Sequence, residues 1–173
     1  MSLPSPVPPD DDASLHDPRL TSIGLLVEVT SGLSRLFADQ IADHDLTPSE
    51  FEVLIRLARS PASQLRMNDL AHQIGLSSSG LTRLADRLEG RALLVRRPCP
   101  DDGRGAYAQL TDDGHELMLA VLPGHLDLIE RWFTGVLDPA QLDALVGALR
   151  TVRAVVHPGA EAGADEPPAD PDA

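Results

Sequence analysis

Three arginines surround one short turn of the chain, in the segment RRPCPDDGRGAY that begins at Arg96. A guanidinium group binds phosphate oxygens, or the N7 and O6 acceptors of guanine, through paired N–H donors. The chain as a whole does not favour such contacts, because its formal net charge is −13. Arginines gathered at one turn of an acidic protein therefore predict that the protein touches a phosphate backbone at this place.

A helix-turn-helix pattern precedes this turn. Asn68 is expected to cap a short helix, Gly75 to break it, and Leu76 to fill the turn from inside. Ser77 is expected to cap a second helix, which carries leucines at helical spacing on one face. Two helices joined by a short turn that contains glycine are typical of a helix-turn-helix unit.

Two short extended segments, LLVRRP and AYAQL, lie on either side of the arginine-bearing turn. The prolines, aspartates and glycines between them favour a turn over a continued helix. We therefore expect a β-hairpin beside the second helix, like the wing of a winged helix. Cys99 falls in this turn, where we expect it to be exposed and its pKa to be lowered by the neighbouring arginines.

Amphipathic helices are predicted on both sides of this unit. A helix from Arg19 to His44 has an apolar surface broader than one face, which a core or a partner subunit would cover. Thr47, Pro48 and Glu50 form a capping-box pattern that begins the next helix. Further helices are expected from Thr111, with a kink at Pro123, and from Asp138-Pro139.

Composition limits the other classes of protein. Residues 1–18 and 157–173 are acidic, proline-rich and free of arginine, and hold nine of the 27 acidic residues, so we expect disordered tails. We find no apolar run of about 20 residues, which a membrane span requires, and no signal-peptide pattern. The single cysteine excludes an internal disulfide framework. These features predict a cytoplasmic protein with no membrane partner.

The order of the predicted elements resembles the MarR family of winged helix-turn-helix regulators. Asp102-x-Arg104, followed by five residues and then Leu110-Thr111, is similar to the wing signature of that family, and SSGLTRLADRLE followed by LLVRR is similar to its recognition helix and first wing strand. One departure is Ala92, where the family commonly has glycine. Because alanine tolerates a left-handed helix end poorly, we expect the helix to end through Gly90 instead.

The resemblance implies a mainly α fold with a small β-hairpin wing. It assigns residues 19–156 to one MarR-like domain, with the winged helix-turn-helix at about 47–110 and dimerisation helices at about 19–44 and 111–156. It implies a homodimer that represses transcription by binding a near-palindromic operator in double-stranded DNA. The residues expected to touch DNA are Ser77, Ser78, Ser79, Thr82, Arg83, Arg87, Arg97 and Arg104, with Asp102 orienting Arg104.

Regulators that this chain resembles often respond to small anionic or phenolic effectors bound between the dimerisation helices and the DNA-binding lobe. Arg19, Arg35, His44 and Trp132 are the candidate effector ligands. Each of the four has a plain alternative role, as a surface group or as a satisfied core group. The sequence alone does not choose between these roles.

The sequence also leaves alternatives to DNA binding with a small effector. Cys99 suggests a redox-responsive regulator of the same fold. A zinc site formed by His44 with residues of the long helix would instead make it a zinc-responsive regulator. A protein-interaction module that keeps the helix-turn-helix shape without DNA binding is a further alternative. The sequence has no glycine-rich phosphate loop, paired metal motif or nucleophile elbow, so we predict no enzyme, cofactor or metal site.

Overall fold

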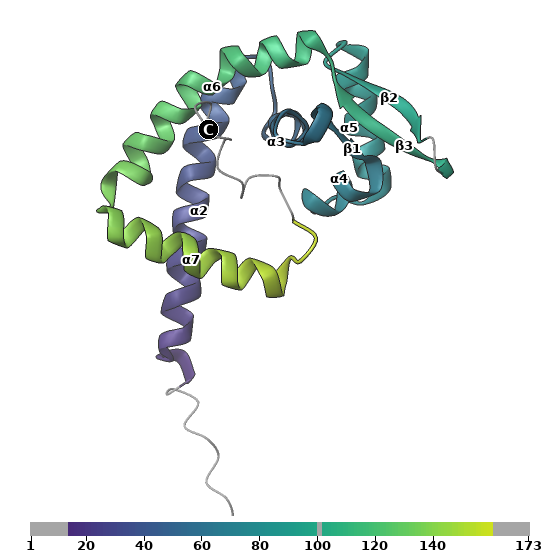
Figure 1. Cartoon of the computed structure of the whole chain (residues 1–173). Coiled ribbons are helices and arrows are strands. Elements are labelled where there is room, and N and C mark those ends of the chain that lie inside the picture. Colours follow the sequence, from purple (N-terminus) through teal and green to yellow (C-terminus); the bar gives the residue numbers. More distant parts are fainter. Residues whose placement is uncertain (1–13, 100–101, 161–173) are drawn as a thin grey trace, which may run out of the picture. The chain divides into compact units, whose positions relative to one another are not determined.

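The structure, a computed structural model, describes residues 14–99 and 102–160 (Figure 1). It confirms a mainly α fold with a small antiparallel β-sheet. The contacts group the chain into two units, residues 1–36 and 37–173. The elements are α2 (Pro18–Ala42), α3 (Pro48–Ala58), β1 (Gln64–Arg66), α4 (Met67–Gln73), α5 (Ser78–Gly90), β2 (Leu94–Cys99), β3 (Asp102–Leu110), α6 (Asp112–Trp132) and α7 (Pro139–Val156), with short 3-10 turns at Pro61–Ser63 and Thr134–Val136.

Helix α2 provides the first unit and continues into the second. Several of its apolar side chains in the first unit, among them Leu25, Val27 and Val29, are half exposed or more, and Ile41 is the buried residue near its end. By length and composition alone, α2 is also apolar enough to cross a membrane, which the sequence analysis did not anticipate. An apolar surface of this extent, in the part of the chain that the structure describes, calls for a covering partner.

The second unit has an aliphatic core. Leu54 and Leu57 of α3, Leu88 of α5, Leu94 of β2 and Val121 of α6 are all 1% exposed or less. Aliphatic packing is expected, because aromatic residues make up only 3% of the chain. The predicted capping box is confirmed, with the Thr47 hydroxyl accepting from the Glu50 backbone N–H and the Glu50 carboxylate accepting from the Thr47 backbone N–H.

The helix-turn-helix is formed by α4 and α5, with two local differences from the prediction. Arg66, not Asn68, is the N-cap residue of α4, because the preceding residues are already extended in β1. Gly75 follows the end of α4, as predicted, and has a left-handed backbone with φ of 68°. Leu76 is 37% exposed rather than inside the turn, since the buried positions there are Ala71 and Leu81.

The predicted wing is present as a sheet of three antiparallel strands in the order β1-β3-β2. The third strand, β1, was not predicted, because it has only three residues and pairs with a segment more than 40 positions away. Cys99 lies at the end of β2 and is 4% exposed, so the expectation of an exposed thiol was wrong. Its pairing partner in the hairpin is Asp102.

Recognition helix and wing are joined by a left-handed residue. Ala92 has φ of 58°, so the helix ends through Ala92 and not through Gly90 as predicted. The Leu93 N–H donates to Leu88 O at 3.0 Å and the Ala92 N–H donates to Glu89 O at 2.9 Å. This is the Schellman pattern, whose two hydrogen bonds offset the cost of a left-handed alanine.

Helix α6 leads away from the wing and runs through Pro123 as one helix (Figure 1). Thr111 caps it by accepting from the Gly114 N–H and donates its own hydroxyl to Ala92 O at 2.6 Å. After α7, His157 Nε2 lies 2.8 Å from His72 O of α4, and Ala160 is 8% exposed. The chain thus contacts the helix-turn-helix just beyond the predicted tail boundary at residue 157.

Candidate nucleic-acid interface

The start of α5 carries three serines on the surface of the protein. Ser77 is the N-cap and its Oγ accepts from the Gly80 N–H at 3.1 Å. Ser77, Ser78 and Ser79 are all exposed. The first N–H groups of a helix and the positive end of its dipole attract phosphate oxygens. The structure therefore makes the three serines available for the predicted backbone contacts.

The exposed face of α5 also carries Thr82, Arg83 and Arg87. The opposite face is anchored by Leu81, Leu84 and Leu88, each 2% exposed or less. Anchoring by leucines fixes which side chains point outward, because residues three and four apart share a face. Thr82 donates its hydroxyl to Ser78 O at 2.8 Å, which fixes the orientation of its side chain.

A buried carboxylate lies behind this face. Glu50 of α3 is 5% exposed, and its Oε1 is 3.4 Å from Nε of Arg87. Burial alone raises the pKa of Glu50, but hydrogen bonds from Thr47 and the charge of Arg87 together lower that pKa below its ordinary value. Sequence analysis identified Glu50 only as a capping residue. Its contact with Arg87, 37 positions away, has no signal in the local sequence.

The arginines of β2 differ from one another. Arg96 is paired with Glu89 at 2.6 Å and with Asp86 at 2.7 Å. The hydrogen bonds from Arg96 lower the pKa of Glu89 and keep this carboxylate ionised. Arg97 is exposed, and its Nε donates to Gln109 Oε1 at 2.5 Å.

The outer face of the sheet carries a row of polar side chains. Arg66, Tyr107 and Arg97 are paired across the three strands in register. The Arg66 guanidinium lies 5.6 Å from the centre of the Tyr107 ring, a cation–π contact. Asp102 and Arg104 belong to β3, but their side chains lie outside the described residues, so their expected roles stay predictions.

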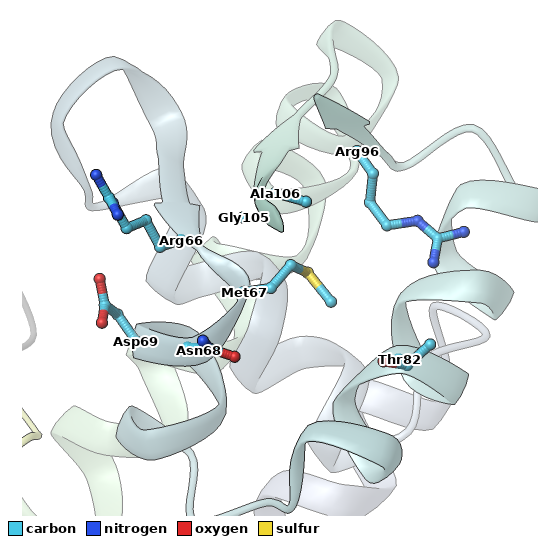
Figure 2. A pocket seen from close by; sticks show the side chains of 8 residues that line it. All are labelled: Arg66, Met67, Asn68, Asp69, Thr82, Arg96, Gly105 and Ala106. Atoms are coloured by element: carbon cyan, nitrogen blue, oxygen red, sulfur yellow. The ribbon is translucent and has the colours of Figure 1, made fainter. Parts of the chain in front are cut away.

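A pocket of about 340 Å³ separates α4, α5 and the wing. Figure 2 shows Arg96 reaching toward Thr82 on one side and Arg66, Met67, Asn68 and Asp69 on the other. Gly105 and Ala106 of β3 complete its wall. The candidate effector residues do not line this pocket.

The candidate effector residues lie elsewhere. Arg19 and Arg35 are exposed in the first unit, where Arg19 is paired with Asp17 at 2.5 Å. In the second unit, His44 is partly buried, and Trp132 is 48% exposed with the Arg131 guanidinium 5.2 Å from its ring. Within the described residues, no group of three or more histidine, cysteine, aspartate or glutamate side chains is placed to hold a metal ion.

Comparison with known proteins agrees with this geometry. The sequence model of the MarR family matches residues 44–105. The HTH-type transcriptional regulator YkoM of Bacillus subtilis, itself uncharacterized, is 35% identical over 116 residues, which cover 66% of this chain and 71% of YkoM.

Two solved structures from Streptomyces coelicolor have the same fold. AbsC, a MarR family transcriptional regulator, superposes with a TM-score of 0.73 at 32% identity, over 79% of this chain and 92% of AbsC. Sco3205, a MarR family regulator solved in complex with DNA, superposes with a TM-score of 0.71 at 30% identity, over 78% of this chain and 88% of Sco3205. Relatives at this level of identity share the helix-turn-helix and the wing described above.

Proposed function

Because this chain belongs to the MarR family of transcriptional regulators, we propose that it is a homodimeric repressor that binds a near-palindromic operator. The observation that supports this proposal best is the outward face of α5, where Thr82, Arg83 and Arg87 are exposed above a leucine anchor. Such a face fits the major groove, where arginine reads guanine through N7 and O6. A regulator of this kind acts in the cytoplasm, on chromosomal DNA.

The wing adds contacts beside the recognition helix. Arg97 is exposed on β2, and Arg104 belongs to the hairpin. In the proposed complex, the three serines and Arg97 bind phosphates and fix the register, whereas Arg83 and Arg87 read base edges. Arg104 enters the minor groove, whose narrow stretches concentrate negative potential, and Asp102 orients it.

We assign the exposed apolar surface of α2 to a second copy of the chain. Helix α2 contains Glu28 and Arg35, and each charge would cost about 2.5–3.5 kcal/mol near the centre of a bilayer. A protein partner covers the apolar side chains and leaves these charges in water. Two copies then place two recognition helices about 34 Å apart, one turn of DNA. Sedimentation of the purified protein should give the mass of two chains, and a lone monomer would contradict the proposal.

The test is a fluorescence-anisotropy titration of purified protein with duplexes from the DNA upstream of its own gene. We expect Arg83→Ala to reduce operator affinity by about 10- to 100-fold, because a bidentate contact to guanine contributes roughly 1–3 kcal/mol. Arg131→Ala is the matched control, since Arg131 lies at the end of α6 that is remote from the wing. Equal affinities of the two variants would contradict the proposed interface.

Modulation by a small anionic or phenolic effector is the second part of the proposal. An effector weakens operator binding only if it binds the DNA-free conformation more tightly than the DNA-bound one. The same titration, repeated with a series of phenolic acids, measures this difference directly. Substituting Arg35 or Trp132 should abolish the response and leave operator affinity without effector unchanged, and an unchanged response would remove that residue from the effector site.

A further inference from the structure

We infer that Glu50 is a positioning residue that holds Arg87 in the orientation in which it reads a base. The inference rests on the proposed function, because it concerns how one arginine of the recognition helix reaches DNA. It goes further by giving a residue outside the helix-turn-helix a part in specificity. Three observations support it: the hydrogen bonds that fix Glu50, the contacts and exposure of Arg87, and the pairing of Glu50 with a second arginine.

The carboxylate of Glu50 is held firmly in place. Its Oε2 accepts hydrogen bonds from the Thr47 backbone N–H at 2.9 Å and from the Thr47 hydroxyl at 3.0 Å. The side chain is 7% exposed, so the surrounding core restricts its rotamers. With Oε2 engaged by the helix cap, Oε1 is the oxygen left to face α5.

Arg87 contacts this oxygen through its Nε atom. Nε lies 3.4 Å from Glu50 Oε1, and Nη1 lies 3.5 Å from Arg83 O. In the part of the chain that the structure describes, Nη2 of Arg87 has no hydrogen-bond partner, and the side chain is 58% exposed. Nε and Nη1 are therefore guided by protein acceptors, while the two N–H donors of Nη2 remain available to a base.

A second arginine also pairs with the Glu50 carboxylate. Arg91 Nη1 lies 3.8 Å from Glu50 Oε2 and donates to Asp45 O at 2.9 Å. Asp45 lies in the turn between α2 and α3, where its φ is 57°. Burying a carboxylate costs free energy unless the group is paired. The two arginines and the hydrogen bonds of the capping box offset this cost for Glu50.

Orientation matters because an arginine discriminates between bases by the geometry of its two donors. A free arginine side chain loses rotamer entropy when it is fixed, and a pre-organised guanidinium loses less. A loose guanidinium can also turn toward a neighbouring phosphate, which every sequence provides. Holding Nε should therefore raise the preference for the operator more than it raises affinity for DNA in general.

The substitution Glu50→Gln separates this role from helix capping. Glutamine completes a capping box as glutamate does. It has one acceptor oxygen, however, so a glutamine that accepts from Thr47 turns its NH₂ group toward Arg87 and loses the contact. The matched control is Glu52→Gln on the same helix, whose carboxylate pairs with Arg56 at 2.9 Å and, within the described residues, makes no hydrogen bond or ion pair to α5.

The experiment measures the affinity of full-length protein for operator and for random duplex, with thermal unfolding as a check on folding. We expect Glu50→Gln to lower the ratio of the two affinities by about tenfold, within the range of one base contact, and Glu52→Gln to leave the ratio unchanged. In an Arg87→Ala background, Glu50→Gln should have little further effect, because the two residues act as a unit.

The outcomes separate the positioning role from the proposed function. If Glu50→Gln keeps the wild-type ratio while Arg83→Ala loses operator binding, the positioning role is overturned and the DNA interface stands. Additive losses for Glu50→Gln and Arg87→Ala, or equal losses for the two glutamine variants, also overturn it, because both indicate a general structural effect. If wild-type protein shows no preference for any upstream duplex, both proposals fall.

Discussion

At the scale of single residues, His125 is the buried titratable base of the second unit. Its ring packs between Phe37 and Phe51, with both ring centres at 4.6 Å, and its Nδ1 lies 3.3 Å from Gln40 Oε1. Burial lowers the pKa of His125 below its ordinary value, because the charged imidazolium is poorly solvated there. The neutral form is therefore the one that fits the site.

The lowered pKa makes folding stability dependent on pH. Below pH 6.5 the unfolded chain binds a proton at His125 and the folded chain resists it, so the free energy of unfolding falls as the pH falls through this range. We expect His125→Phe to flatten this part of the curve, measured by urea unfolding at several pH values between 7.5 and 5. His115→Gln, an exposed histidine on the same helix, is the control. An unchanged slope in His125→Phe would contradict the assignment.

The sequence predicted single residues well where a local pattern defines them. The capping roles of Thr47 and Ser77 follow from residue type and from the helices that they precede, and both are confirmed. The outward direction of Thr82 and Arg83 follows from the leucine spacing. The contacts of Glu50 and His125 could not be predicted, because each depends on helices that are distant in the sequence and meet only in the folded chain.

At the scale of elements, the recognition helix, the wing and α6 are tightly packed where they meet. A Cβ atom on Gly114 would lie 2.1 Å from Leu93 O and 2.8 Å from Cδ1 of Leu110. The Leu93 carbonyl also accepts from the Thr111 N–H at 3.2 Å. Only glycine allows the first turn of α6 to lie against the start of β2.

We expect Gly114→Ala to destabilise the protein by about 2–3 kcal/mol, the usual cost of inserting a group into a packed site. Gly90→Ala is the matched control, since its Cβ would meet nothing within 4 Å and alanine stabilises a helix by roughly 0.5–1 kcal/mol relative to glycine. Urea unfolding of the two variants measures both effects. Similar stabilities for both would show that the junction adjusts without cost.

Helices were easier to predict than the short strand and the ends of helices. Long apolar periodicity and strong caps located α3, α5, α6 and α7. Strand β1 has three residues and exists because β3 pairs with it, which no local signal shows. Ala92 was misjudged because the Schellman hydrogen bonds, and not the intrinsic preference of alanine, decide its backbone.

At the scale of the whole molecule, charge is separated along the chain. The terminal segments 1–13 and 161–173 hold eight of the 27 acidic residues and none of the 14 arginines. Carboxylates repel the negatively charged phosphate backbone, and salt screens this repulsion beyond about 10 Å at moderate ionic strength. The acidic ends should therefore oppose binding to DNA of any sequence.

Deleting residues 1–13 and 161–173 should raise affinity for random duplex and leave the preference for operator intact. The truncation keeps residues 157–160, because His157 and Ala160 contact the folded body. Filter binding at two salt concentrations tests the prediction, and the difference between the two proteins should shrink at the higher salt. Unchanged affinity for random duplex would exclude an electrostatic role of the ends.

Cys99 gives the wing a chemical reporter of its own. The chain has a single thiol, and it is enclosed at the end of β2. An alkylating reagent added to native protein would react at one position only, and only while the strand edge is open. The labelling rate thus measures how often the hairpin opens locally, without any engineered probe. A slower rate with operator bound would show that DNA binding stabilises the closed hairpin.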